Sequence, residues 1–295
     1  MIQGIPAGVG AYIVWGLFPL YWKLLAAVPA PETVSHRIVW SLLLVAGFLG
    51  WRGRLAAVGA ALRDRWSLAM SGLCGAMIAL NWSAFIWGVS SGRTVEVSLG
   101  FFLTPLVSVV LSRVFLGERL PWGQLAGVGL ASAGVLWLAS ALDEIPWVSL
   151  TLALTFGVYG LAKKQVRLAP AEGMLLETGA LAPLALGWLV WLAVQGQGAF
   201  LHSGPAVDLL LIGGGLVTLT PLLLFAAATQ SVSLSLLGML QYISPTLHLA
   251  IGVFVFGEPF SAERLVGFGA VWAGLVVFLL AHRRAQRPRP EETRP

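Results

Sequence analysis

The 295-residue sequence contains little charge, because Asp, Glu, Lys and Arg together make up 11% of it. Soluble domains carry about 25% charged residues. The chain also has a single cysteine, Cys74, which excludes an intrachain disulfide and a cysteine-based metal site. Apolar residues are abundant instead, at 58% with a mean hydropathy of +0.85. Most of this surface must face lipid or other buried helices, so the composition indicates an all-α integral membrane protein.

Catalytic motifs are missing as well. The sequence has no HExxH zinc motif, no nucleophile elbow and no Walker loop. We therefore expect no enzymatic activity, no cofactor and no metal. Without a nucleotide-binding motif, any active transport would run on an ion or substrate gradient unless a separate ATPase subunit joins.

Ten apolar segments are each long enough to cross a bilayer, which takes about 20 residues per helix. Pro and Gly punctuate the joins between them. An Arg- and Pro-rich stretch at 282–295 follows the last segment, and we expect it to be a disordered cytoplasmic tail. The ten segments lie at about 4–24, 33–51, 67–89, 94–115, 121–140, 146–163, 172–194, 207–228, 235–256 and 261–281.

The two halves of the chain repeat each other at a constant offset. Pro105 matches Pro245 and Glu118 matches Glu258, since 245 − 105 and 258 − 118 both equal 140. We expect a first repeat over 1–140 and a second over 146–281, with five helices each. Five is an odd number, so the second repeat enters the membrane upside down. Such inverted repeats are typical of secondary transporters, whose site lies where the repeats meet.

Basic residues are distributed unevenly between the two sides. With the N-terminus inside, 14 of the 18 Lys and Arg residues fall in cytoplasmic connections or the tail, and Lys163 and Lys164 are among them. The other side receives Lys23, Arg37, Arg93 and Arg264. By the positive-inside rule, this predicts both termini in the cytoplasm. Because the basic residues sit at the ends of apolar segments, the net charge of +5 does not indicate nucleic-acid binding.

Several stretches carry a family pattern. The chain opens with GAYIVWGLFPLYWK at 10–23, and HRIVWS follows at 36–41. In these two stretches and in six further ones, the chain resembles the RarD proteins of the EamA branch of the drug/metabolite transporter superfamily. The resemblance covers about 4–281. The further stretches are Asn81-Trp82, 98–102, 115–120, 225–228, 241–247 and 256–259.

The resemblance implies ten helices in two inverted EamA repeats, an inner-membrane location and a permease role. The chain departs from the family pattern at two positions. Thr104 stands where relatives often carry Asn before the proline, and His248 stands where they often carry Gln.

Small and polar residues follow one face of the predicted fourth helix and the equivalent face of the ninth. The first face includes Phe101, Pro105 and Ser108, and the second includes Gln241 and His248, all at helical spacing. Such faces either line a wet cavity or pack closely on another helix. We expect them to line a central cavity, closed in part by the first helix.

Polar and aromatic residues within the spans supply the candidate site. Each proline removes a backbone N–H, so Pro19, Pro105 and Pro245 are candidates for helix breaks or gating. Asn81 could either contact the substrate or form a hydrogen bond to another helix. Lys23 could either line the cavity or extend its side chain to the lipid headgroups. The cavity candidates are Trp15, Tyr21, Lys23, His36, Arg37, Asn81, Trp82, Phe101, Thr104, Gln241, Tyr242 and His248.

Titratable groups deep in the spans are candidates for energy coupling. His248 could carry a proton, or it could be a neutral histidine bonded to a hydroxyl or carbonyl. Glu177 is the acidic candidate. At the start of the fourth predicted helix, Arg93 and Glu96 are expected to form a local ion pair. Glu118 and Glu258 are expected to cap a helix or pair with a neighbouring arginine.

These features favour a secondary transporter or exporter of a small amphipathic metabolite or drug that works by alternating access. A membrane-embedded enzyme acting on a lipid or peptide, with chemistry from His36 and His248, is a second hypothesis. A structural or sensory membrane protein without flux is a third. The expected partners are a small-molecule substrate and the lipid bilayer, with a homodimer as one option.

Overall fold

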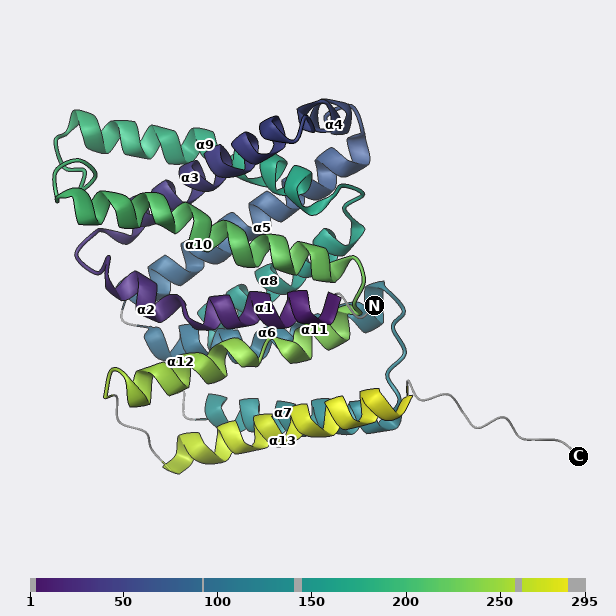
Figure 1. The fold of residues 1–295 in the computed structure, drawn as a ribbon. Helices are drawn as coiled ribbons and strands as arrows, with labels where there is room; N and C mark the ends of the chain where they lie inside the picture. Colours follow the sequence, from purple (N-terminus) through teal and green to yellow (C-terminus); the bar gives the residue numbers. More distant parts are fainter. Residues whose placement is uncertain (1–3, 92, 141–144, 258–261, 286–295) are drawn as a thin grey trace, which may run out of the picture.

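The computed structural model describes residues 4–91, 93–140, 145–257 and 262–285. Over these residues the chain is helical and contains no strand (Figure 1). The helices are α1 (Gly4–Gly16), α2 (Phe18–Lys23), α3 (Ala30–Trp51), α4 (Leu55–Ala61), α5 (Arg65–Ser90), α6 (Thr94–Phe115), α7 (Trp122–Ala139), α8 (Trp147–Gln165), α9 (Pro170–Val194), α10 (Pro205–Thr229), α11 (Leu234–Leu240), α12 (Ile243–Phe254) and α13 (Ala262–Ala285).

The ten predicted membrane segments are all present as helices. Nine spans in the described part are long and apolar enough to cross a bilayer, and two of them join short helices, α1 with α2 and α11 with α12. The tenth is α8, which has 19 residues and is more polar because its last turn contains Lys163 and Lys164. The prediction of an all-α membrane protein with ten spanning helices is confirmed. The short helix α4 was not predicted, because it lies in a loop.

The helix starts follow the repeat seen in the sequence. α3, α5, α6 and α7 begin at residues 30, 65, 94 and 122, and α9, α10, α11 and α13 begin at 170, 205, 234 and 262. Each pair differs by 140. Figure 1 shows α3 and α9 crossing the bundle in opposite directions, as inverted repeats require.

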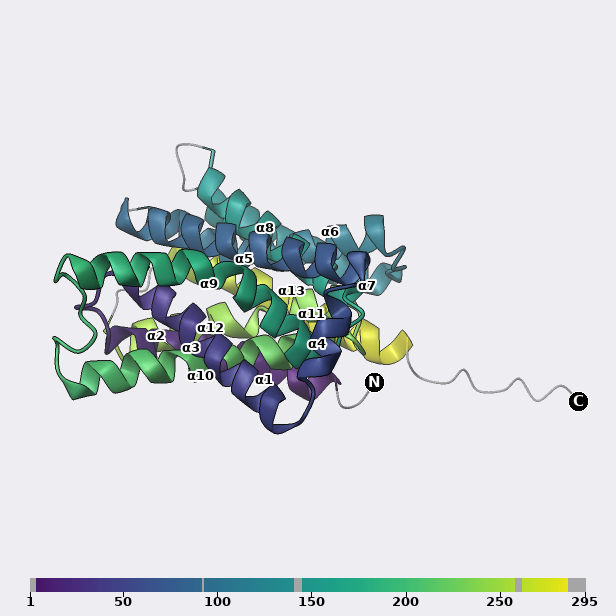
Figure 2. The same ribbon diagram turned by 90° about the horizontal axis from the view of Figure 1, so that it is seen from above.

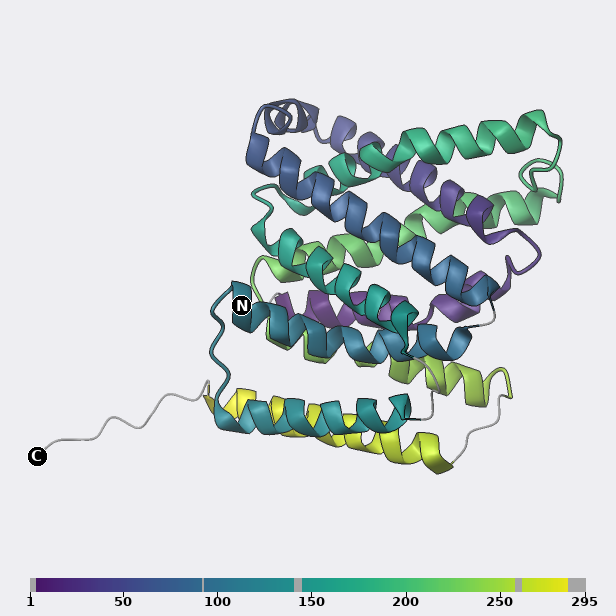
Figure 3. The ribbon, with the colours of Figure 1, turned by 180° about the vertical axis from the view of Figure 1, so that it is seen from behind.

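The helices form two layers, and each layer contains helices from both repeats. In one layer α3 contacts α10, α10 contacts α1, and α1 contacts α12. In the other, α9 contacts α5, α5 contacts α8, and α8 contacts α6, as Figure 3 shows from behind. Across the layers, α3 packs on its own repeat equivalent α9, and α6 packs on α11, the helix that starts 140 residues later. The first residue of α1 and the last of α13 lie at the same end of the bundle (Figure 2), as an even number of crossings requires.

Glycines let α7 and α13 pack backbone against backbone at one edge of the bundle. A Cβ on Gly134 would lie 2.6 Å from the carbonyl oxygen of Gly267, and one on Gly274 would lie 2.6 Å from that of Gly127. Only a missing side chain allows helices to approach this closely. These four positions form the repeat-equivalent pairs 127/267 and 134/274.

Two of the spans are interrupted, and proline accounts for the first interruption. Pro19 has no N–H to donate to the carbonyl of Trp15, four residues earlier, and the helix breaks between Gly16 and Phe18. In the ninth span the helix is interrupted at Gln241 and Tyr242, just before Pro245. The equivalent fourth span, α6, stays continuous through Pro105. The two repeats therefore differ at a matched proline.

The last helix continues past residue 282, where we expected a disordered tail to begin. Helix α13 continues to Ala285, and contacts of the His282 ring stabilise its last turn. Its Nδ1 lies 3.2 Å from Nε2 of Gln124 on α7, and the ring stacks on Phe278. These contacts hold the last turn in helical form. Residues 286–295 lie outside the described residues.

Candidate functional site

A small enclosed cavity lies between the two layers. Its volume is about 10 Å³, close to the space that one water molecule needs. Five helices enclose it, namely α3, α5, α8, α9 and α10. Three predicted site residues line it: Arg37, Trp82 and Glu177. The remaining lining residues are Ile38, Ser41, Ile78, Tyr159, Met174, Thr178, Leu181, Thr218 and Leu222.

Arg37 places a positive charge in this cavity. Its position, seven residues after the start of α3, puts it about 10 Å into the helix at 1.5 Å per residue. Nε donates to the hydroxyl of Thr218 on α10 at 2.9 Å. The guanidinium carbon lies 4.6 Å from the ring centroid of Trp22 and 4.8 Å from that of Trp82. Aromatic faces thus stabilise a cation that would otherwise be costly within the bilayer.

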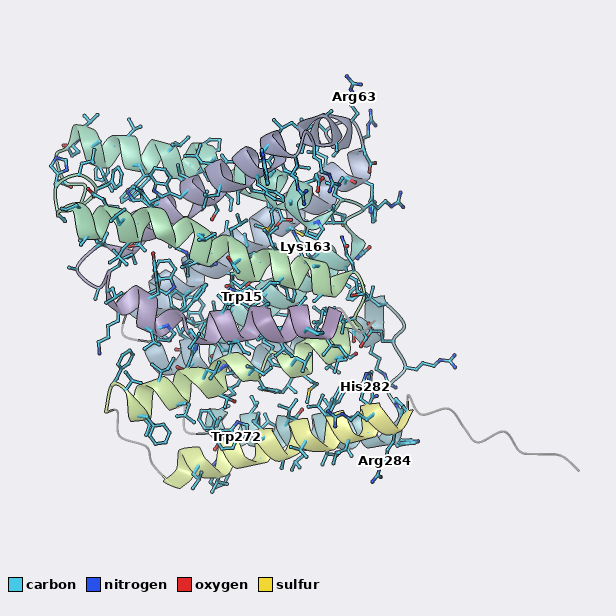
Figure 4. All side chains as sticks on the ribbon, in the orientation of Figure 1. Trp15, Arg63, Lys163, Trp272, His282 and Arg284 are labelled. Atoms are coloured by element: carbon cyan, nitrogen blue, oxygen red, sulfur yellow. The ribbon has the colours of Figure 1, made fainter. Side chains whose placement is uncertain are left out.

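Glu177 forms a buried ion pair with Lys163 beside the cavity. Lys163 Nζ donates to Oε1 of Glu177, and the Tyr159 hydroxyl donates to Oε2 at 3.4 Å. The side chains of the pair are 2% and 3% exposed. The prediction that Lys163 lies in a cytoplasmic connection is wrong, because its side chain is buried and paired with Glu177. Lys163 lies within the bundle, whereas Arg63 and Arg284 project away from it (Figure 4).

Lys163 was missed because Lys163 and Lys164 are adjacent at a helix end, where lysines usually face water. Lys164 does serve that end: Nζ donates to the carbonyls of Thr229 and Val232 at 3.2 and 2.6 Å. Adjacent helical residues point in different directions, about 100° apart. One lysine therefore turns inward toward Glu177 while the other caps α10.

His248 contributes to helix packing. Its Nε2 lies 3.0 Å from the carbonyl oxygen of Trp15. A carbonyl only accepts, so Nε2 is the donor. This oxygen is the one that Pro19 leaves without a helical partner. Ser244, one turn earlier, donates to the carbonyl of Tyr12 at 2.7 Å, so two side chains of α12 hold the first helix at its break.

Asn81 joins two helices. Nδ2 donates to the carbonyl of Leu152 and to the hydroxyl of Thr155 on α8, both at 3.0 Å. From the sequence, Asn81 could either contact the substrate or form a hydrogen bond between helices. In this conformation its amide is committed to bonding between α5 and α8, while the neighbouring Trp82 faces the cavity.

His36 lies at one end of α3 with Glu32. Nδ1 accepts a hydrogen bond from Nε1 of Trp40 at 3.2 Å, and Nε2 lies 3.9 Å from Oε1 of Glu32. The same Glu32 oxygen accepts the backbone N–H of Ala199 at 2.6 Å and that of Phe200 at 3.3 Å, in the loop after α9. His36 therefore belongs to a contact that closes one end of the bundle.

Glu172 makes the equivalent contact at the other end. It lies in the first turn of α9, as Glu32 does in α3, and the two differ by 140 residues. Its Oε1 is 2.8 Å from Arg54, in the loop after α3. Each glutamate thus binds the loop that follows its partner's helix. The described structure is closed at both ends of the α3–α9 pair.

The faces of the fourth and ninth helices pack against each other here. A Cβ on Gly238 would lie 2.9 Å from Cβ of Ser108 and 3.0 Å from the carbonyl of Pro105. The Tyr242 hydroxyl donates to the carbonyl of Phe102 at 3.2 Å. The enclosed cavity of this conformation is therefore lined by other helices than the two that we expected.

The other candidates lie in packed surroundings or near the ends of the spans. Trp15 lies inside the bundle among the rings of Tyr12, Phe156 and Phe225, each 5.7 Å away (Figure 4). Lys23 is exposed, with Nζ 3.6 Å from the ring of Phe256. The rest are Tyr21, which donates to the carbonyl of Leu210; Thr104, which donates to that of Gly100; Phe101, whose ring is 6.0 Å from His248; and Gln241, which is buried at the end of α11.

Two glutamates cap helices of the other repeat. Glu118 accepts from the backbone N–H groups of Leu234 and Ser235 at 2.8 and 3.1 Å, at the start of α11. Its expected capping role is confirmed. Glu96 forms the expected ion pair with Arg93 at 2.7 Å and also accepts from the first turn of α8. Glu258 lies outside the described residues.

Comparison with known proteins gives consistent results. The EamA-like transporter family matches residues 2–140. Protein RarD of Streptomyces exfoliatus is 42% identical over 287 residues, which cover 97% of this chain and 91% of that protein. The uncharacterized transporter YojE of Bacillus subtilis (strain 168) is 42% identical over 294 residues, covering 97% and 96%. A solved crystal structure with 19% identity has the same fold, with a TM-score of 0.72 over 97% of this chain and 100% of that one.

Proposed function

Because the chain belongs to the RarD proteins of the EamA-like transporter family and is a multi-pass membrane transporter, we propose that it is a secondary carrier that works by alternating access. Its substrate is a small amphipathic metabolite or drug, and export is the direction we favour. The enclosed cavity between the layers carries this proposal, since polar residues from both repeats meet there.

The difference between the two repeats supports alternating access. Pro105 and Pro245 occupy matched positions, yet α6 is continuous and the ninth span is interrupted. In an inverted-repeat carrier the two repeats exchange conformations when access changes sides. The opposite state would then have an interrupted fourth span and a continuous ninth one.

Glu32 and Glu172 supply matched closures for such a cycle. Each bridges the α3–α9 pair at one end of the bundle, and both bridges are formed while the cavity is closed. Opening toward one side would break one bridge and leave the other intact. This agrees with a cavity that has space for about one water in the present state.

Glu177 is the stronger of the two coupling candidates. It lines the cavity, and Lys163 neutralises it. His248, by contrast, donates to a carbonyl that needs a partner. A proton on Glu177 would release Lys163 and so change the charge of the cavity wall, which could bias one of two conformations.

The sequence and the family support a proposed location and orientation. We place the chain in the cytoplasmic membrane with both termini in the cytoplasm, as the distribution of basic residues predicts. Lys163 and Arg37 both lie inside the bundle, and without them 13 basic residues remain on the cytoplasmic side against three on the other. A homodimer stays a prediction.

A flux assay tests the transport proposal. Purified protein in proteoliposomes should move at least one member of a panel of small amphipathic compounds, in efflux and counterflow, with and without a pH gradient. Glu177→Gln should reduce that flux, and exposed Arg63→Met is the matched control. Protein that binds panel members but never accelerates their movement above protein-free vesicles would contradict the proposal.

A further inference from the structure

Arg37 has no counter-ion among the residues that the structure describes. Among the described residues, no carboxylate lies within ion-pair distance of its guanidinium, and its one hydrogen bond goes from Nε to Thr218. Glu177 lines the same cavity, but its carboxylate is already paired with Lys163. Arg37, which lines the cavity, therefore carries a positive charge that no described carboxylate balances, and the faces of Trp22 and Trp82 hold it.

A second donor beside Arg37 also lacks an acceptor. The indole Nε1 of Trp22 is buried and has no hydrogen-bond partner within the described part of the chain, and the centroid of its ring lies 4.6 Å from the guanidinium carbon of Arg37. A buried donor without an acceptor destabilises the protein, so buried polar groups usually have a hydrogen-bond partner. Both unmatched groups call for the same kind of ligand atom, an oxygen that accepts.

We propose that Arg37 and Trp22 form the head-group site for a small organic monoanion with one carboxylate, and that this is the substrate class of the transporter. A guanidinium presents two terminal N–H groups that match the two oxygens of a carboxylate. The site offers one free cation among the described residues, which suits a single negative charge rather than a dianion. This inference rests on the proposed transport function.

The rest of the ligand is apolar. Trp82, Ile38, Ile78 and Leu222 line the cavity around Arg37, and they would contact a ring or a short hydrocarbon chain. The closed cavity is too small for such a ligand, so binding requires one end of the bundle to open.

The test compares four probes that share a phenyl ring: benzoate, benzamide, benzylamine and phenylphosphonate. Equilibrium dialysis of purified protein in zwitterionic-lipid nanodiscs should show that benzoate binds at least about tenfold more tightly than the other three. Arg37→Met should weaken benzoate binding by about tenfold or more and leave benzamide unchanged. Arg52→Met, at the exposed end of the same helix, should change neither.

Two further variants keep the test decisive if Arg37→Met does not fold. Arg37→Lys keeps the charge but loses the paired donors, and Trp22→Phe keeps the ring but removes the indole N–H. Each should weaken benzoate binding several-fold. Equal binding of benzoate and benzamide, or a preference for phenylphosphonate, would overturn the proposal. So would loss of benzoate binding in phosphatidylglycerol nanodiscs, because that result would assign the site to lipid headgroups.

Measuring binding and flux separately distinguishes failure of the proposed anion site from failure of the proposed transport function. Arg37-dependent benzoate binding without flux of any compound would uphold the anion site and refute transport. Flux of neutral or cationic compounds that is unaffected by Arg37→Met, with no benzoate binding, would uphold transport and refute the anion site.

Discussion

At the scale of single residues, the buried charges of this protein differ in how they are balanced. Lys163 and Glu177 neutralise each other, while Arg37 is held by a hydroxyl and aromatic rings. Removing one member of a buried pair leaves an unpaired charge, whereas replacing both can be nearly neutral. This asymmetry separates a structural role of the pair from a functional one.

Glu177→Gln should lower the free energy of unfolding by about 3–5 kcal/mol and reduce flux strongly, because Lys163 would remain buried without its carboxylate. The double variant Lys163→Met with Glu177→Leu should recover most of the stability but not the flux. Thermal unfolding in detergent and flux in proteoliposomes measure the two effects. Recovery of flux in the double variant would show that the pair has no part in transport.

His248→Gln should retain flux, and the flux should keep its dependence on pH between about 5.5 and about 8, the range over which histidine usually titrates. A glutamine amide can still donate to the carbonyl of Trp15, which His248 bonds at 3.0 Å. His248→Leu should be less stable by about 1–3 kcal/mol, because that carbonyl loses its donor. If His248→Gln abolishes the pH dependence, coupling belongs to His248 after all.

At the scale of elements, the sequence was sufficient for the spans and insufficient for their interior contacts. Apolar length and Pro or Gly punctuation located the ten segments within a few residues. The repeat offset located the equivalent helices, since helix starts at 30 and 170 or at 122 and 262 differ by 140. Nothing in the sequence indicated that Lys163 turns inward or that Thr218 is the partner of Arg37, because partners 181 residues apart depend on tertiary packing.

Gly134→Ala should separate α7 from α13 and lower the free energy of unfolding by about 1–3 kcal/mol, because the new Cβ would lie 2.6 Å from the carbonyl of Gly267. Gly129→Ala on the same helix is the control, since a Cβ there meets nothing within 4 Å. Chemical or thermal unfolding of the purified proteins compares the two. Equal stability of both variants would show that backbone contact at this edge contributes little.

At the scale of the whole molecule, topology and access can be read with cysteine reagents. Cys74, the native cysteine, is buried, so it should give little background labelling. A cysteine at exposed Gln197 should react with an impermeant reagent from outside, and one at exposed Arg63 should react only after the membrane is opened. The reverse pattern would invert the proposed orientation.

The two end closures should control access from opposite sides. Thr178 lines the cavity, so a cysteine at 178 reports its opening. Glu172→Gln removes the ion pair with Arg54 and should speed labelling of that cysteine from the cytoplasmic side. Glu32→Gln weakens the bridge to Ala199 and Phe200 and should speed labelling from outside. If both variants raise labelling from the same side, the two bridges are not opposing closures.

The interleaving of the two repeats also bears on the order in which the protein is made. The ribosome completes α3 long before α9 and α10 exist, so Arg37 enters the membrane without Thr218, and Glu32 enters without the amides of Ala199 and Phe200. The first half of the nascent chain therefore waits with an exposed charge until its neighbours arrive. A chain that stops after residue 140 should be recognised as unfinished and degraded, and supplying residues 141–295 as a separate polypeptide should rescue it.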